Sequence, residues 1–158
     1  MKNKLSVIQA VITLVAALLT MLDGMFTWIT YTMFENISKR EISLNNLMIT
    51  QQICGGPLLY WLFMFAIILM LVYCIIEIFF EDKIPSTKAY IAIPSIITLL
   101  GSIMIIACSN YKDTFNYYGE TRNVAISMGV LAYIEIALLI TMVLIECYKQ
   151  FKCDKTNQ

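Results

Sequence analysis

Few side chains in this sequence could do chemistry, and the one that stands out is Glu135, an acid inside an apolar stretch. Residues 123–147 read NVAISMGVLAYIEIALLITMVLIEC, with Glu135 near the middle. About 20 apolar residues in a helix are enough to cross ~30 Å of hydrocarbon. A charged, unpaired side chain at that depth costs at least ~2.5 kcal/mol, and such residues are usually functional. Glu135 is therefore the first candidate for an intramembrane polar site.

Two hydroxyl residues could accompany this acid. The midpoints of two other apolar runs fall near Thr13 and Thr98, so the three side chains could share one layer of a helix bundle. Three roles for Glu135 follow. It could bind a proton or a cation, or it could hook the transmembrane helix of a partner. Alternatively, it could be a protonated acid that holds helices together through hydroxyl groups or backbone carbonyls.

The residue types needed for catalysis or metal binding are scarce. The chain has no histidine, which removes the commonest general base and metal ligand. Its five cysteines form no C-x-x-C pair, so zinc, haem and thioredoxin-type sites are not indicated. No nucleophile stands beside a base. We therefore expect neither an enzyme nor a cofactor. The formal net charge of zero gives no reason to expect a nucleic acid partner.

Two of the cysteines could form a disulfide. Cys54 and Cys108 are both predicted at the outer boundary of the membrane, where an oxidising exterior would permit the bond. The alternative is two unrelated thiols.

The composition is that of a membrane protein. The chain is 59% hydrophobic and 14% charged, whereas a soluble domain carries about 25% charged residues. Its apolar residues gather in four long runs, which predicts a single all-α membrane domain over residues 1–158, a bundle of four transmembrane helices. The predicted spans are residues 5–24, 58–80, 89–108 and 123–147.

The ends of these runs contain three ambiguous features. Lys2 and Lys4 before an apolar run resemble a secretory signal, but the following LLTMLDG offers no small-x-small cleavage site, so we expect an uncleaved first span. Glu77 lies near the inner end of the second span and is expected to reach the membrane surface. Pro94 falls in the first turns of the third span, where proline is tolerated.

The two predicted outer loops, residues 25–57 and 109–122, contain strand-like segments. Residues 26–34 read FTWITYTMF, which is rich in threonine, isoleucine and aromatic residues. The polar ENISKRE is predicted to turn. Residues 41–52 are predicted to form a second strand, which could break at Asn45-Asn46, and residues 114–118 a further one. Together these segments predict a small antiparallel sheet outside the membrane. The alternative is that residues 25–34 continue the first helix.

Basic residues give the orientation. The N-terminus, the 81–88 connector and the C-terminal tail together hold seven lysines, whereas the two other loops hold four lysine or arginine residues. Because basic residues accumulate on the cytoplasmic side, both termini are expected there, most simply in the plasma membrane.

The layout is similar to that of claudin-type tetraspan proteins. Those proteins have a short internal N-terminus, a long first outer loop that forms a small sheet and a shorter second outer loop. The resemblance covers the whole chain but only in layout. The family's first-loop pattern of tryptophan, leucine-tryptophan and paired cysteines is not met, because Trp28 stands alone and Cys54 is the only cysteine of that loop.

These observations favour a protein that acts by binding. It would serve as an accessory subunit of a membrane complex or as a self-protection (immunity) protein at the membrane. Besides the lipid bilayer, its expected partner is another membrane protein or a second copy of itself. The alternative is a transporter or an oligomeric pore that uses Glu135.

Overall fold

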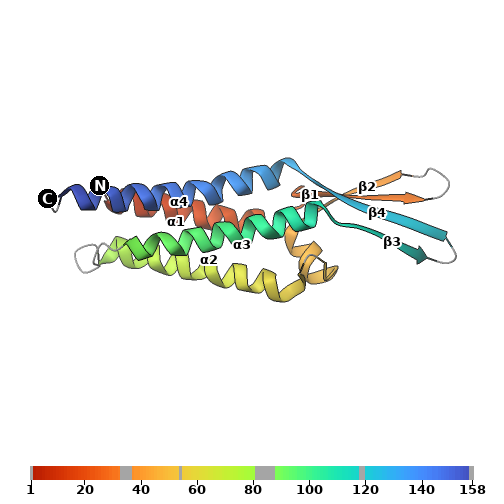
Figure 1. Cartoon of the computed structure of the whole chain (residues 1–158), viewed down its shortest axis with the longest axis horizontal. Helices are drawn as coiled ribbons and strands as arrows, with labels where there is room; N and C mark the ends of the chain where they lie inside the picture. The colour runs from red at the N-terminus through yellow and green to blue at the C-terminus, as the bar shows by residue number, and fades with distance from the viewer. Residues whose placement is uncertain (1, 33–36, 54, 81–87, 118–119, 157–158) are drawn as a thin grey trace.

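The computed structural model describes residues 2–32, 37–53, 55–80, 88–117 and 120–156. Four helices lie side by side, and two β-hairpins extend from one end of the bundle (Figure 1). The elements in chain order are α1 (Lys2–Leu19), β1 (Phe26–Thr32), β2 (Ile37–Ile42), the π-helical turn η1 (Asn46–Thr50), α2 (Gly56–Phe79), the 3₁₀ turn η3 (Lys88–Ile91), α3 (Ala92–Ser109), β3 (Lys112–Tyr117), β4 (Glu120–Met128) and α4 (Val130–Thr156).

Three of the described helices are long and apolar enough to cross a membrane. They are α2, α3 and the 130–152 part of α4, and they confirm three of the predicted apolar helices. The apolar part of α1, Lys4–Leu19, is shorter. The predicted run to residue 24 was too long, because Met21 and Leu22 donate to carbonyls only three residues back and the chain turns. Gly24 follows with a φ of +101°.

The start of the fourth predicted span was also wrong. Residues 123–128 belong to β4, and α4 begins only at Val130. Gly129 permits the change from strand to helix. Its N–H donates to the Met25 carbonyl at 2.7 Å, and a Cβ here would lie 2.1 Å from the Gly24 carbonyl oxygen. Gly129 therefore lets the chain pass against the segment that leads into β1.

A small antiparallel sheet is present, with the strand order β2-β1-β4-β3. The 26–34 prediction is confirmed by β1 as far as residue 32, and the 114–118 prediction by β3 as far as residue 117. Residues 33, 34 and 118 lie outside the described part of the chain. The alternative of a continued first helix is wrong. The first predicted outer loop supplies one hairpin, whereas most of β4 in the second hairpin was predicted as the start of the fourth span. The two hairpins are joined because β1 pairs with β4, with Trp28 opposite Ile126.

The second predicted strand, residues 41–52, was misplaced. The partner of β1 is Ile37–Ile42, with Phe26 opposite Ile42, so the polar segment expected to turn supplies most of β2. Leu44, Leu47 and Met48 are buried, and the chain turns through η1 to place them against the end of the bundle. Burial of these side chains explains why the chain leaves the sheet here.

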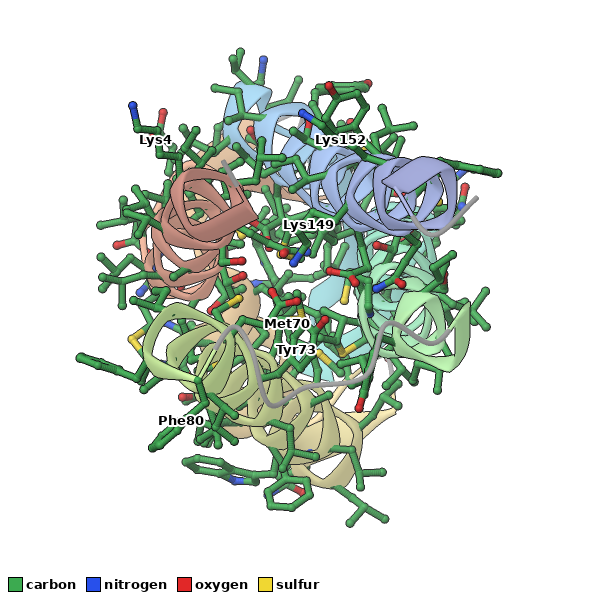
Figure 2. All side chains as sticks on the ribbon, turned by 90° about the vertical axis from the view of Figure 1, so that its left-hand side faces the viewer. Lys4, Met70, Tyr73, Phe80, Lys149 and Lys152 are labelled. Carbon is green, nitrogen blue, oxygen red and sulfur yellow. The ribbon has the colours of Figure 1, made fainter. Side chains whose placement is uncertain are left out.

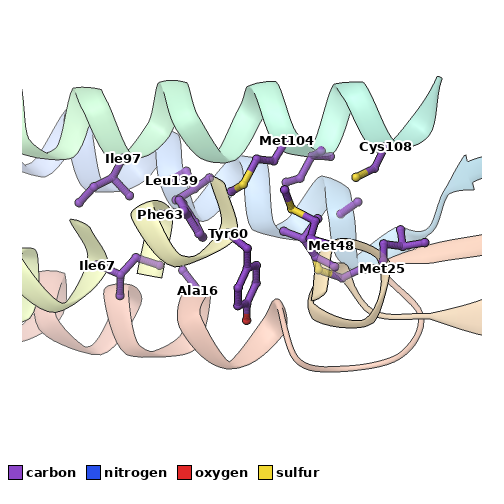
Figure 3. Close-up of a cluster of buried hydrophobic side chains, with 14 of the residues drawn as sticks. Ala16, Met25, Met48, Tyr60, Phe63, Ile67, Ile97, Met104, Cys108 and Leu139 are labelled. Atoms are coloured by element: carbon purple, nitrogen blue, oxygen red, sulfur yellow. The ribbon is translucent and has the colours of Figure 1, made fainter. Parts of the chain in front are cut away.

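The core lies between the four helices and continues to the foot of the sheet. Figure 3 shows Tyr60, Phe63 and Met104 in the bundle, with Met25 and Met48 at its sheet end. The outward faces of the helices are apolar as well. The most exposed of these large apolar side chains are Leu58, Phe79, Val130 and Phe151.

Candidate functional site

Glu135 points into the bundle and has no hydrogen-bond partner among the described residues. Its side chain is 0% exposed, and both carboxyl oxygens are buried without a donor or acceptor within reach. Since α4 begins at Val130, Glu135 lies only ~8 Å from the sheet end of its helix. The acid is therefore buried but not at mid-span.

Thr13 and Thr98 form a layer without Glu135. The Thr98 hydroxyl lies 2.9 Å from the Leu139 carbonyl oxygen, and the Thr13 hydroxyl lies 3.0 Å from Met142 Sδ. Each hydroxyl also lies within 2.8 Å of a carbonyl of its own helix. The two threonines thus meet α4 at residues 139–142, one to two turns deeper than Glu135.

The candidate disulfide stays a prediction. Cys108 is completely buried at the end of α3, while Cys54 lies outside the described residues.

The densest group of buried polar side chains lies at the other end of the bundle, near the chain termini. We call it the inner charge cluster. Its members come from three helices, and all are under 9% exposed: Ser6, Gln9, Tyr73, Glu77, Glu146, Lys149 and Gln150. Viewed from that end, Lys149 and Tyr73 point into the space between the helices (Figure 2).

Lys149 is the centre of the inner charge cluster. Its ammonium forms ion pairs with Glu77 and Glu146, at 2.6 Å from Glu146 Oε2. The same nitrogen donates to Gln9 Oε1 at 2.6 Å. It also lies 5.2 Å from the centre of the Tyr73 ring, within cation–π range. The ammonium thus meets groups from α1, α2 and α4.

The two carboxylates are held by further donors. The Ser6 hydroxyl donates to Glu77 Oε2 at 2.7 Å, and the Gln150 amide donates to Glu146 Oε1 at 2.7 Å. The Tyr73 hydroxyl lies between them, 2.7 Å from Glu77 Oε1 and 3.0 Å from Glu146 Oε1. Such donors reduce the cost of burying charge. With its ammonium engaged on three sides, Lys149 links helices and is not placed to act as a free base.

The expectation that Glu77 reaches the membrane surface was wrong, because its side chain is 1% exposed. The sequence did contain a signal for the cluster. Glu146 and Lys149 are three residues apart and share a face of α4. Glu77 lies near the C-terminal end of α2, which is at the same end of the bundle. Only the helix packing, however, shows that the three side chains meet.

Neither a metal cluster among the described residues nor a matching family indicates a function. No group of three or more cysteine, aspartate or glutamate side chains able to hold a metal occurs in the described part of the chain. No protein family model, curated protein or solved structure matches the sequence.

Proposed function

We propose that this chain is an integral membrane protein with four spans and both termini on the cytoplasmic side of the plasma membrane. Three long apolar helices with apolar outward faces support insertion. The shorter α1 packs against α2 and α4, so it would cross with them. The excess of lysine near the inner charge cluster supports the orientation. The sheet would then stand outside the cell.

The function that the geometry supports best is binding of a protein partner through this sheet, as an accessory subunit or a self-protection protein. The observation that carries the proposal is the exposure of the sheet beyond the bundle. Tyr31 and Ile37 stand opposite one another on β1 and β2 and are 40% and 58% exposed. An exposed cross-strand pair of this kind is a usable contact for a partner.

Photo-cross-linking in intact cells tests this proposal. A photoreactive amino acid at position 31 should give a stoichiometric protein adduct, which mass spectrometry would identify. The matched control is position 133, a 62% exposed tyrosine on the side of α4, which should give lipid adducts. A protein adduct from position 133 and none from position 31 would place the partner against the helices and contradict binding by the sheet.

A second candidate is a proton or cation transporter or an oligomeric pore that uses Glu135. It is favoured by one observation, the burial of both Glu135 carboxyl oxygens without a partner among the described residues. Such a group is expected where a proton or a cation binds transiently during transport. Purified protein in liposomes should then conduct, and Glu135→Gln should abolish the flux while the protein remains folded. Absence of flux from the unaltered protein would reject this candidate.

A further inference from the structure

One face of the sheet carries a cation and an anion on its two outer strands. In the register, Arg40 stands opposite Trp28, and Trp28 opposite Ile126, so the three side chains share a face. Asp113 stands opposite Val124, two residues from Ile126, and so lies on the same face. Neither Arg40 nor Asp113 forms an ion pair within the described part of the chain.

This face is hollowed where it overhangs the segment from η1 to α2. A cavity of about 220 Å³ is lined by Trp28, Arg40, Ile42 and Gln51. A second cavity, of about 200 Å³, shares Trp28 and Gln51. Its other lining residues are Ile53, Tyr111, Asp113 and Val124. The two cavities adjoin at Trp28 and Gln51, which line both, while Arg40 lines the first and Asp113 the second. We call the two together the Trp28 groove.

The groove begins where the apolar helices end. Ile53 lies three residues before α2, and Tyr111 lies two residues after α3. Phe26 lies at the buried foot of the sheet. Trp28 is two residues further along β1, which places it ~7 Å farther from the helix bundle. The headgroup layer on each side of a bilayer has a similar thickness, because the two layers together add ~10–15 Å to a ~30 Å hydrocarbon core. Tryptophan concentrates in this layer. The Trp28 groove therefore opens at headgroup level.

The charges that line the groove define the ligand chemistry. Arg40 presents a guanidinium, which binds phosphate with two parallel hydrogen bonds. Asp113 accepts from the Tyr111 hydroxyl at 2.8 Å and the Thr114 N–H at 2.7 Å, and a carboxylate has about four acceptor positions. It can therefore also accept from a primary ammonium. The outer strands β2 and β3 are ~14 Å apart, a distance that the long arginine side chain partly spans.

We propose that the Trp28 groove binds the headgroup of an aminophospholipid of the phosphatidylethanolamine type. The phosphate lies against Arg40, the primary ammonium against Asp113, and the linking carbons on Trp28. Each cavity is smaller than the ~300–1,000 Å³ of a drug-sized pocket, which suits a headgroup whose tails remain outside. Leu58 and Trp61 are 74% and 60% exposed in the first turns of α2 and offer apolar surface for the tails. This inference rests on the membrane insertion proposed above.

Fluorescence titration tests the inference. The chain has two tryptophans, so a Trp61→Phe background leaves Trp28 as the single reporter. Detergent-solubilised full-length protein is titrated with a short-chain phosphatidylethanolamine. The Trp28 emission should change saturably. Arg40→Gln and Asp113→Asn should each weaken binding at least tenfold. The matched control is Lys39→Gln, which removes the adjacent charge on the opposite face of β2 and should leave binding unchanged.

Other lipids identify the chemistry. A short-chain phosphatidylglycerol, which has the phosphate without the ammonium, should bind at least tenfold more weakly. Equal affinity for the two lipids would overturn the role of Asp113. Unchanged binding by Arg40→Gln would overturn the site.

Two further measurements separate the possible failures. A photoreactive residue at position 51 should give a lipid adduct in cells, and a protein adduct there would show that the groove belongs to a partner protein instead. Resistance to alkaline extraction reports insertion independently. A protein that is inserted but does not bind the lipid contradicts this inference alone, whereas a protein that is not inserted contradicts the proposed function.

Discussion

Lys149 Nζ donates a 2.6 Å hydrogen bond to Gln9 Oε1, across 140 positions of the chain. The same ammonium is paired with Glu77 and Glu146, so one buried cation joins α4 to α1 and α2. Removing one partner of a buried ion pair is costly, because the remaining charge stays buried without compensation. Lys149 therefore contributes to the packing of α4 against α1 and α2 at this end of the bundle.

The first prediction concerns that lysine. Lys149→Met should destabilise the protein by about 3–5 kcal/mol, because two carboxylates lose their shared cation. Thermal unfolding in detergent measures the loss. Adding Glu77→Gln should recover part of it by removing one of the stranded charges. The control is Lys4→Met, at an exposed position of α1. An unchanged midpoint for Lys149→Met would show that the cluster contributes nothing to stability.

The second prediction compares two acids on the same helix. Glu135→Leu should leave stability unchanged or raise it by about 1–3 kcal/mol, because the carboxyl has no partner in the described structure. Thr13 and Thr98 should be unaffected, since their hydroxyls contact α4 elsewhere. Glu146→Leu is the matched control. It should destabilise, because Glu146 is bonded to Tyr73, Lys149 and Gln150. Similar losses for both variants would mean that Glu135 has a partner that the structure does not show.

Parts of this architecture could be predicted from the sequence because the signals are local. Long charge-free runs identify apolar helices without reference to the rest of the chain. The threonine and aromatic residues of β1 identify a strand in the same way. By contrast, β2 reads ISKREI and is almost wholly exposed, so no apolar alternation marks it. What makes it a strand is its pairing with β1.

The candidate site required information that is not local. Residues 123–128 are apolar enough for a helix and β-branched enough for a strand, and their pairing with β1 decides between the two. Glu77 and Lys149 are 72 positions apart, so their contact depends on how α2 and α4 pack. That no described residue bonds to Glu135 is likewise a property of the packed bundle.

The third prediction concerns orientation in the membrane. In a variant without the five native cysteines, Lys112→Cys should react with an impermeant thiol reagent in intact cells. Lys4→Cys should react only after permeabilisation. The reason is the accumulation of basic residues at the end of the bundle that holds the inner charge cluster. The reverse labelling pattern would invert the topology and place the sheet in the cytoplasm.

The fourth prediction concerns the junction of sheet and bundle. Gly129→Ala should destabilise by more than the ~1–3 kcal/mol typical of overpacking, because the new Cβ would meet the Gly24 carbonyl oxygen at 2.1 Å and backbone cannot give way as a side chain can. Gly101→Ala is the comparison, since its Cβ would meet only side chains, of Leu139 at 2.6 Å and Phe63 at 2.9 Å. Gly129→Ala should therefore be the more harmful in thermal unfolding. Hydrogen exchange should show that the loss of amide protection is concentrated in β1 and β4, whose pairing begins beside Gly129. If Gly101→Ala proved the more harmful and the strands stayed protected, the close approach of the two backbone segments would not be holding the sheet to the helices.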